Sequence, residues 1–576
     1  ARDQIDNEAR WELCGERCFL YRMFRRAYQG NEEDKKRLNL FYAYLVIKEN
    51  LRSELIQSNG RIGFQNFQRY DRRKKMLIAQ SSLENVVLKL AIKDTLSNPS
   101  LKHLEVRIVP KDTVEGNVSF LKQITVIDYS GEQTDDKKAT LQNLSNRYYF
   151  VFHFTKSIDD TPKELYGTSC RHERKRALIR KQACCITGLR ERFPMEAKRV
   201  LGIDACSAEI GCRPEVFAQA FRYLKNHCVS DKWKNNDERN LPQLRVTYHV
   251  GEDFLDIVDG MRAIDEAVHF LNLNCGDRLG HALALGIDVK EYYKMKHNVV
   301  SLSKQDYLDN LAWIYDRITK YRLGMELNDL RNFVEKEFSK YFGEVYGNLA
   351  QRHNFNIRTY FSAWGLRGDK PDYYKFGKFD QPVWQTRTEG EYQSYDSYAM
   401  NYQYPKDLDV REVETVAYLY HAYHYDKEVK IRGEEKGEFI IPECWIEGTE
   451  RLQKMLQREI AFKGISIESN PTSNYMISVL DSYENHPIVK WYNNHLIQDP
   501  VKLADCPQLS VSINTDDKGC FSTSLENEYA LMACALERAK DENGWSLYSR
   551  TMIYEWLDEI RKMGNLQSFQ EDKGYA

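Results

Sequence analysis

The sequence has no surplus of either charge and no long apolar run. Its 83 Lys and Arg residues nearly balance 85 Asp and Glu residues, for a formal net charge of −2. Global charge therefore favours neither nucleic acid nor a membrane surface as a partner. No apolar run reaches the roughly 18 residues that a membrane span needs, and no secretory signal is visible. We expect a cytoplasmic location and no membrane partner.

The cysteines show no pattern that indicates disulfides or a cysteine-based metal site. There are 13, an odd number, with no repeated Cys-x-x-Cys spacing. Disulfide frameworks use even numbers of cysteines at regular spacing, and disulfides are rare in the cytosol. Reduced thiols are therefore expected.

The most informative segment is Thr-Tyr-His-Val-Gly-Glu, residues 247–252. A strand-like run from Leu244 to Tyr248 ends at His249, and Glu252 follows after a turn at Gly251. Strand ends that meet a loop are where α/β barrels place their chemistry. His249 is a candidate metal ligand and Glu252 a candidate acid or base beside it. The alternative is a hydrogen-bonded structural histidine.

Two later segments have the same form, a predicted strand that ends in polar residues. Residues 277–283 place His281 after a glycine, and residues 509–517 end in Asp516 and Asp517. Adjacent carboxylates repel each other and are tolerated most easily where a cation neutralises one of them. A single Asp-Asp pair is also typical of a turn, but three such strand ends together favour one site.

In this order the three segments resemble the adenosine and AMP deaminases of the metal-dependent hydrolase superfamily. The resemblance continues in five further segments: Leu104–Pro110, Tyr148–Phe154, Val200–Glu209, Ile465–Asn474 and His486-Pro487. It implies an α/β fold, a (β/α)8 TIM-type barrel with a helical N-terminal part and a large insertion after strand six. The segments would form strands two to eight. The cytidine-deaminase signature, His-x-Glu followed by Pro-Cys-x-x-Cys, is absent.

The chain divides into four predicted parts. Residues 1–100 are expected to be mainly helical, and residues 101–290 alternate strand-like and helical segments, as barrel strands two to six require. Residues 291–440 are the predicted insertion, serving as a lid or for oligomerisation. Its Trp313, Trp364 and Trp384 are of the type found in interface cores. Residues 441–576 would supply strands seven and eight and the C-terminal helices.

The resemblance assigns a role to each candidate site residue. His249 and Asp516 would be zinc ligands, and zinc lowers the pKa of bound water from about 15.7 to about 7. Glu252 would protonate the purine ring, while His281 orients the metal-bound hydroxide and stabilises its charge. Asp517 would hydrogen-bond the five-membered ring of the purine. Ser207 stands where the family often has a glycine that contacts the base, so contacts there are expected to differ.

One expected motif is missing. The family's first strand ends in His-x-His, which supplies two metal ligands, and this sequence contains no His-x-His. We expect that strand to precede residue 1. The alternative is a metal-free scaffold that binds nucleotides.

The predicted function is zinc-dependent deamination of adenosine, an adenine nucleotide such as ATP, or adenosine in RNA to the inosine form. Length and insertion most resemble the deaminase subunit of RADAR-type bacterial antiphage systems. That resemblance implies antiviral defence, a large homo-oligomer and an ATPase partner protein. The alternative enzyme is a housekeeping adenosine or AMP deaminase.

Two lesser features have open interpretations. The basic stretch Arg171–Lys181 would contact phosphates at the pocket mouth, or form a solvated helix face. His421 and His424 would bind a metal or, more simply, belong to a surface or interface helix.

Overall fold

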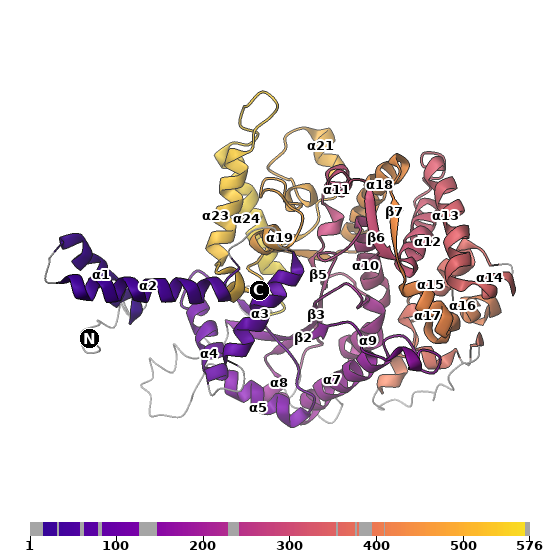
Figure 1. Cartoon of the computed structure of the whole chain (residues 1–576), viewed down its shortest axis with the longest axis horizontal. Helices are drawn as coiled ribbons and strands as arrows, with labels where there is room; N and C mark the ends of the chain where they lie inside the picture. The colour runs from indigo at the N-terminus through magenta and orange to yellow at the C-terminus, as the bar shows by residue number, and fades with distance from the viewer. Residues whose placement is uncertain are drawn as a thin grey trace.

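The fold is given by a computed structural model of the chain (Figure 1). It describes residues 15–30, 34–57, 63–78, 83–125, 147–228, 241–352, 355–374, 377–379, 394–407 and 409–570.

Seven parallel strands form one sheet, in the order β1-β2-β3-β4-β5-β8-β9. β-Branched and aromatic residues dominate β2 and β4, as the nine-residue run Tyr148–Lys156 of β2 shows. Their bounds are β1 Leu104–Ile108, β2 Tyr148–Lys156, β3 Val200–Ser207, β4 Arg245–Val250, β5 Arg278–His281, β8 Ser466–Ser469 and β9 Val511–Ile513. The strands predicted as numbers two to eight are therefore all present, in the predicted order.

The sheet curls around a polar interior. The guanidinium of Arg107 on β1 lies 2.5 Å from a carboxylate oxygen of Glu468 on β8, although four strands separate them in the sheet. Arg278 on β5 pairs with Glu105 on β1 at 2.7 Å. Only a curled sheet brings these strands face to face. Within the described residues β9 and β1 do not pair, so closure into an eight-stranded barrel stays a prediction.

Helices cover the outer face of the sheet, as parallel strands require. α10 illustrates the packing, because most of its residues are buried between the sheet and the neighbouring helices. The covering helices are α5 Val114–Ile124, α7 Glu173–Arg192, α8 Pro194–Ala197, α9 Ala218–Asn226, α10 Ile257–Phe270 and α18 Glu443–Phe462. Short 3-10 turns are η3 Lys163–Leu165, η4 Pro214–Val216, η7 Leu283–Leu285, η8 Leu366–Gly368, η9 Pro371–Tyr373, η11 Tyr395–Tyr398 and η12 Asp409–Glu412.

Between β5 and β8 the chain forms a helical unit built on a second, two-stranded sheet. β6 (Val299–Ser303) and β7 (Lys436–Ile440) pair antiparallel, and neither strand was predicted from the sequence. The helices are α11 Val289–Met295, α12 Lys304–Lys320, α13 Asn328–Tyr346, α14 Asn348–Arg352, α15 Ile357–Gly365, α16 Glu414–Tyr425 and α17 Lys427–Glu434.

The tryptophans of this segment correct one prediction. Trp313 is 0% and Trp364 is 1% exposed in the single chain. The indole nitrogens of both donate to buried carboxylates, those of Asp265 at 2.9 Å and Glu266 at 3.1 Å. Both side chains therefore fix the helical unit onto α10 and are not a surface for subunit contacts. Trp384 lies outside the described residues.

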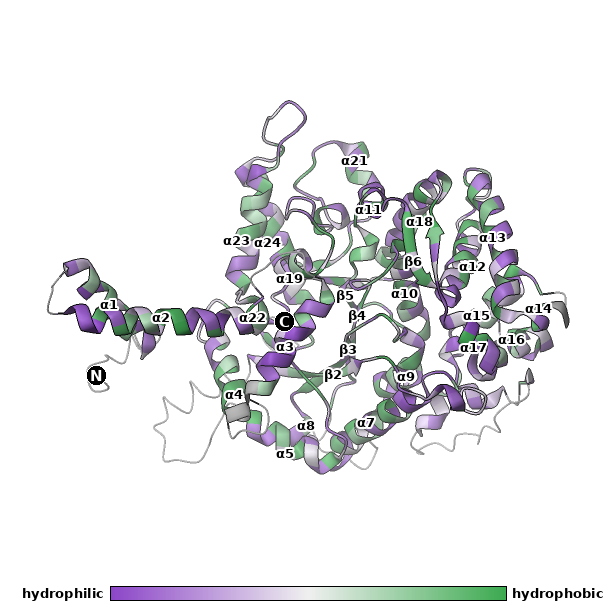
Figure 2. Cartoon of the chain, in the orientation of Figure 1, coloured by the Kyte–Doolittle hydropathy of each residue, from purple (hydrophilic) through white to green (hydrophobic). Residues whose placement is uncertain are grey.

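The N-terminal helices are α1 Glu16–Gln29, α2 Lys35–Leu55, α3 Phe64–Ile78 and α4 Leu83–Leu96. α1 and α2 project from the body at the left of Figure 1 and carry apolar residues along their length (Figure 2). α3 instead packs against α22 (Lys518–Phe521), the short helix after β9, where Phe67 stacks on Phe521 with ring centroids 5.4 Å apart.

The C-terminal helices follow β8 and β9. They are α19 Pro471–Ile477, α20 Ile488–Trp491, α21 Pro500–Asp505, α22 Lys518–Phe521, α23 Leu525–Arg538 and α24 Arg550–Leu566. The last two lie in the segment that was predicted to supply C-terminal helices. After α24 the chain turns into the sheet interior, where Phe569 lies under the guanidinium of Arg278, 3.7 Å from ring centroid to Cζ. No helix in the described part of the chain is long and apolar enough to cross a membrane.

Candidate metal and active site

A cavity of about 1850 Å³ runs along β1 and includes the carboxyl ends of the strands in its lining. Polar loops follow the strands at this edge, which is where parallel α/β sheets form their sites. Its lining includes all six residues predicted for the site: Ser207, His249, Glu252, His281, Asp516 and Asp517.

Three potential metal ligands meet in this cavity. Ligand atoms of His249, His281 and Asp516 all lie within 4.8 Å of one another. His281 and Asp516 have left-handed backbone conformations, with φ of 62° and 51°, and such strained residues cluster at functional sites. Two imidazoles and a carboxylate are ligands that zinc accepts, so the residues present fit a zinc ion. Their individual roles stay predictions.

Glu252 is 8% exposed and directly contacts His281. The distance from its Oε1 to Nδ1 of His281 is 3.0 Å. Burial alone would lower the pKa of His281, but the carboxylates of Glu252 and Asp516 raise it to about 9. His281 and Glu252 therefore form one hydrogen-bonded pair at the buried side of the cavity.

The loop that carries Glu252 is held by a residue from the neighbouring strand end. The carboxylate of Glu209 accepts hydrogen bonds from the backbone N–H groups of Gly251 at 2.7 Å and Glu252 at 3.1 Å. Gly251 has φ of 77°, and a side chain there would meet Ile264 at 2.6 Å. A glycine is therefore required at this turn, in agreement with the predicted turn.

Two asparagines that follow β8 also contact His281. Nδ2 of Asn474 lies 2.8 Å from Nδ1 of His281 and 3.4 Å from Oε1 of Glu252. Its Oδ1 is 3.1 Å from Nε2 of His486, and burial lowers the pKa of that histidine to about 3. Asn470 also contacts His281, at 3.2 Å. The sequence reasoning placed these residues at strand seven but gave them no role.

Arg107 is a central residue that the sequence reasoning missed. Its Nη1 lies 3.1 Å from Nε2 of His249 and 3.1 Å from Oδ2 of Asp204. Burial would lower its pKa, but Glu468, Glu105 and Asp204 raise it well above the usual value, so the guanidinium stays charged. Arg107 thus joins the His249 side of the site to the charged interior of the sheet.

Asp517 and Ser207 line the cavity in different settings. The side chain of Asp517 caps α22 by accepting from the N–H groups of Gly519 and Cys520, both at 3.0 Å. It also pairs with Lys74 of α3 at 2.7 Å. Burial would raise the pKa of Asp517, and Lys74 holds it below the usual value. Ser207 ends β3 with φ of 82°. Their predicted substrate contacts stay predictions.

The basic stretch does not line the main cavity. All of residues 171–181 are described and none is among its lining residues. Arg174 pairs with Asp160 at 3.4 Å and Arg176 with Glu215 at 3.4 Å. Of the two open interpretations, a helix face therefore fits these residues better than contact with phosphates at the mouth of this cavity. At the start of α7, Arg174, Arg176 and Arg180 pair with nearby carboxylates.

The histidines of α16 also stay outside the groups of potential metal ligands found in the described residues. His424 is fully buried, and burial lowers its pKa well below the usual value. It is therefore a packed helix residue.

Comparison with known proteins gives one short match in sequence. No family model matches the chain. A stretch of 98 residues is 34% identical to an adenine deaminase of Mesorhizobium japonicum, covering 17% of this chain and 26% of that relative's length. A crystal structure of adenine deaminase from Arthrobacter aurescens covers 90% of this chain and 89% of that one, at 11% identity and a TM-score of 0.32. At that TM-score the likeness adds nothing to the description of the fold, which rests on strand order.

Proposed function

We propose that this protein is a metal-dependent hydrolase that deaminates an adenine-containing compound, with zinc as the metal. The observation that carries the proposal is the meeting of His249, His281, Asp516 and Glu252 in one cavity at the carboxyl edge of the sheet. The short match to an adenine deaminase supports the same chemistry.

In the proposed reaction water replaces the exocyclic amine of the adenine ring, and ammonia leaves. His249 and Asp516 would hold the zinc ion. The bound ion would lower the pKa of its water to about 7. Glu252 delivers a proton to the ring nitrogen next to the reacting carbon, as a buried carboxyl group can. His281, positioned by Glu252 and Asn474, orients the attacking water.

The finer assignments rest on the resemblance described for the sequence. The first is an adenosine-deaminase-type activity on adenosine, ATP or RNA. The others are a role in antiviral defence and the assembly of this protein into a homo-oligomer with an ATPase partner. The name of the short sequence match adds free adenine as a candidate substrate.

The test is ammonia release by the zinc-loaded full-length protein, with adenine, adenosine, AMP, ATP and RNA compared at equal concentration. Turnover of one of them that stops on chelation and returns with zinc is the expected result. Nucleotide binding without turnover of any substrate by protein of full zinc content would contradict the proposal and favour the scaffold alternative.

A further inference from the structure

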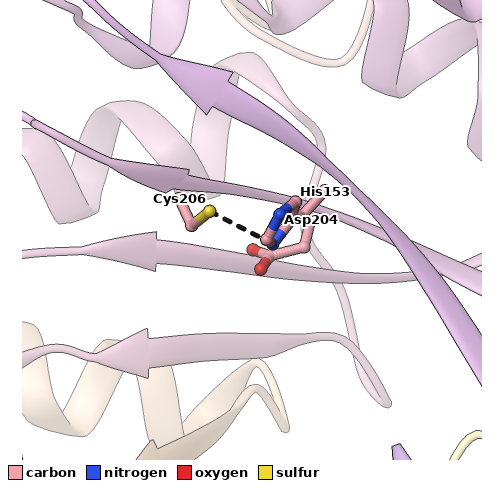
Figure 3. Close-up of side chains that lie close together, drawn as sticks. All are labelled: His153, Asp204 and Cys206. Carbon is pink, nitrogen blue, oxygen red and sulfur yellow. Dashed lines mark hydrogen bonds between the residues drawn. The ribbon is translucent and has the colours of Figure 1, made fainter. Parts of the chain in front are cut away.

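A second group of potential metal ligands lies beside the first, on β2 and β3. It consists of His153, Asp204 and Cys206, whose ligand atoms all lie within 4.8 Å of one another (Figure 3). Sγ of Cys206 is 3.2 Å from Nδ1 of His153. His153 and Cys206 line the same cavity as the first group.

Strand pairing brings these three side chains together. His153 on β2 is the direct neighbour of Asp204 on β3 in the parallel register. Asp204 and Cys206 are two residues apart on one strand, so their side chains point to the same face of the sheet. That face is the curled interior, which also holds His249. The juxtaposition therefore follows from the fold and not from a flexible surface loop.

The donor set suits a divalent, moderately soft cation. Zinc binds thiolate sulfur at about 2.3 Å and imidazole nitrogen at about 2.0–2.1 Å, so neighbouring ligand atoms in a tetrahedral site lie about 3.3–3.8 Å apart. The sulfur-to-nitrogen distance of 3.2 Å is close to that range. Asp204 also pairs with Arg107, which Glu105 and Glu468 contact in turn.

We propose that His153, Asp204 and Cys206 bind a second divalent metal ion of zinc-like chemistry, separate from the ion assigned to His249 and Asp516. Asp204 links the two positions, because its Oδ1 lies 3.0 Å from Nδ1 of His249. A carboxylate has about four lone-pair sites, so Asp204 orients His249, accepts from Arg107 and still offers a ligand atom. Second-shell carboxylates that hold a ligating histidine in this way are common at metal sites.

Cobalt spectroscopy separates the two positions, because only the second contains sulfur. The full-length protein is loaded with Co²⁺, and its near-ultraviolet absorption and metal content are measured. We expect a thiolate-to-cobalt charge-transfer band in the wild type. In Cys206→Ser the band should disappear and one metal ion per chain should be lost. Cys212→Ser, a buried cysteine outside the group, is the matched control and should keep both.

Asp516→Asn tests independence from the first position. It should lower the metal content while the sulfur band persists, whether or not the protein turns over any adenine compound. A cobalt-loaded wild type without the band, or a Cys206→Ser protein that keeps it, would overturn the proposal. If Cys206→Ser does not fold, X-ray absorption of the zinc-loaded wild type decides: a sulfur neighbour at about 2.3 Å is required, and its absence refutes the site.

Discussion

Replacing Glu252 by Gln tests the catalytic assignment most directly. The substitution preserves the size of the side chain, and the amide can still contact Asn474 and His281, which lie 3.4 and 3.0 Å from Oε1 of Glu252. It removes the group that moves a proton. Positioned acid–base groups contribute about 10²–10⁴-fold to the rate, which corresponds to about 2.7–5.4 kcal/mol of barrier. We expect kcat to fall by that factor, with little change in metal content.

The assay is ammonia release at saturating substrate, with zinc content and thermal unfolding measured on the same preparation. Asp253→Asn is the matched control. It changes the next carboxylate along the same loop, which lines a separate cavity of about 410 Å³. Because burial and the nearby carboxylates raise the pKa of Asp253 to about 7, a neutral side chain there should change turnover little. Near-normal turnover by well-folded, zinc-loaded Glu252→Gln protein would remove Glu252 from the mechanism.

Three further predictions follow from the described contacts. Asp516→Asn should lower zinc affinity and release part of the bound metal, as measured by dialysis and elemental analysis. Phe569→Ala should lower the free energy of unfolding by about 3–5 kcal/mol, because Phe569 is 5% exposed and packs on Arg278. Chemical denaturation measures the change, and a loss below about 1 kcal/mol would contradict this packing. Arg174→Gln with Arg180→Gln should leave deamination of ATP and adenosine equally unchanged, because both are half-exposed surface residues paired with carboxylates.

The sheet was predictable because its strands carry two signals at once. β2 and β4 are short runs of β-branched and aromatic residues, β3 begins with an apolar run, and each strand end meets polar residues at a loop. β6 and β7 were not predicted from the sequence. They alternate buried and exposed residues over only five positions each, and they pair across the whole helical unit between them. When two strands that pair lie so far apart in the sequence, no local sequence pattern indicates that they pair.

The tryptophans show why composition could not place the helical unit. An aromatic side chain suits an interface core or a domain core equally well, since both exclude water. Trp313 and Trp364 became core residues because Asp265 and Glu266 of α10 accept their indole N–H groups. Those carboxylates lie on another element, and the sequence alone does not join them to the tryptophans.

The sequence of β1 indicates that the sheet has a charged interior. In β1 the residues Leu-Glu-Val-Arg-Ile place Glu105 and Arg107 two apart, so both side chains point to the same face. A strand with charges on alternate positions has a polar face, and a polar face inside a curled parallel sheet requires partners on other strands. Glu468 on β8 and Asp204 on β3 supply them. The partners themselves could only be identified once the register was known.

Residues at and just after the end of β3 contact most parts of the site, although the sequence motifs of the site lie on β4, β5 and β9. Asp204 orients His249 at 3.0 Å, and Cys206 faces His153. Glu209 fixes the Glu252 loop through three backbone N–H groups. A change in how β3 ends would therefore move a predicted metal ligand and the predicted proton donor together. Effects of substitutions at Asp204 and Glu209 should for this reason be non-additive with those at His249 and Glu252, because residues in one hydrogen-bond network share their interaction energy.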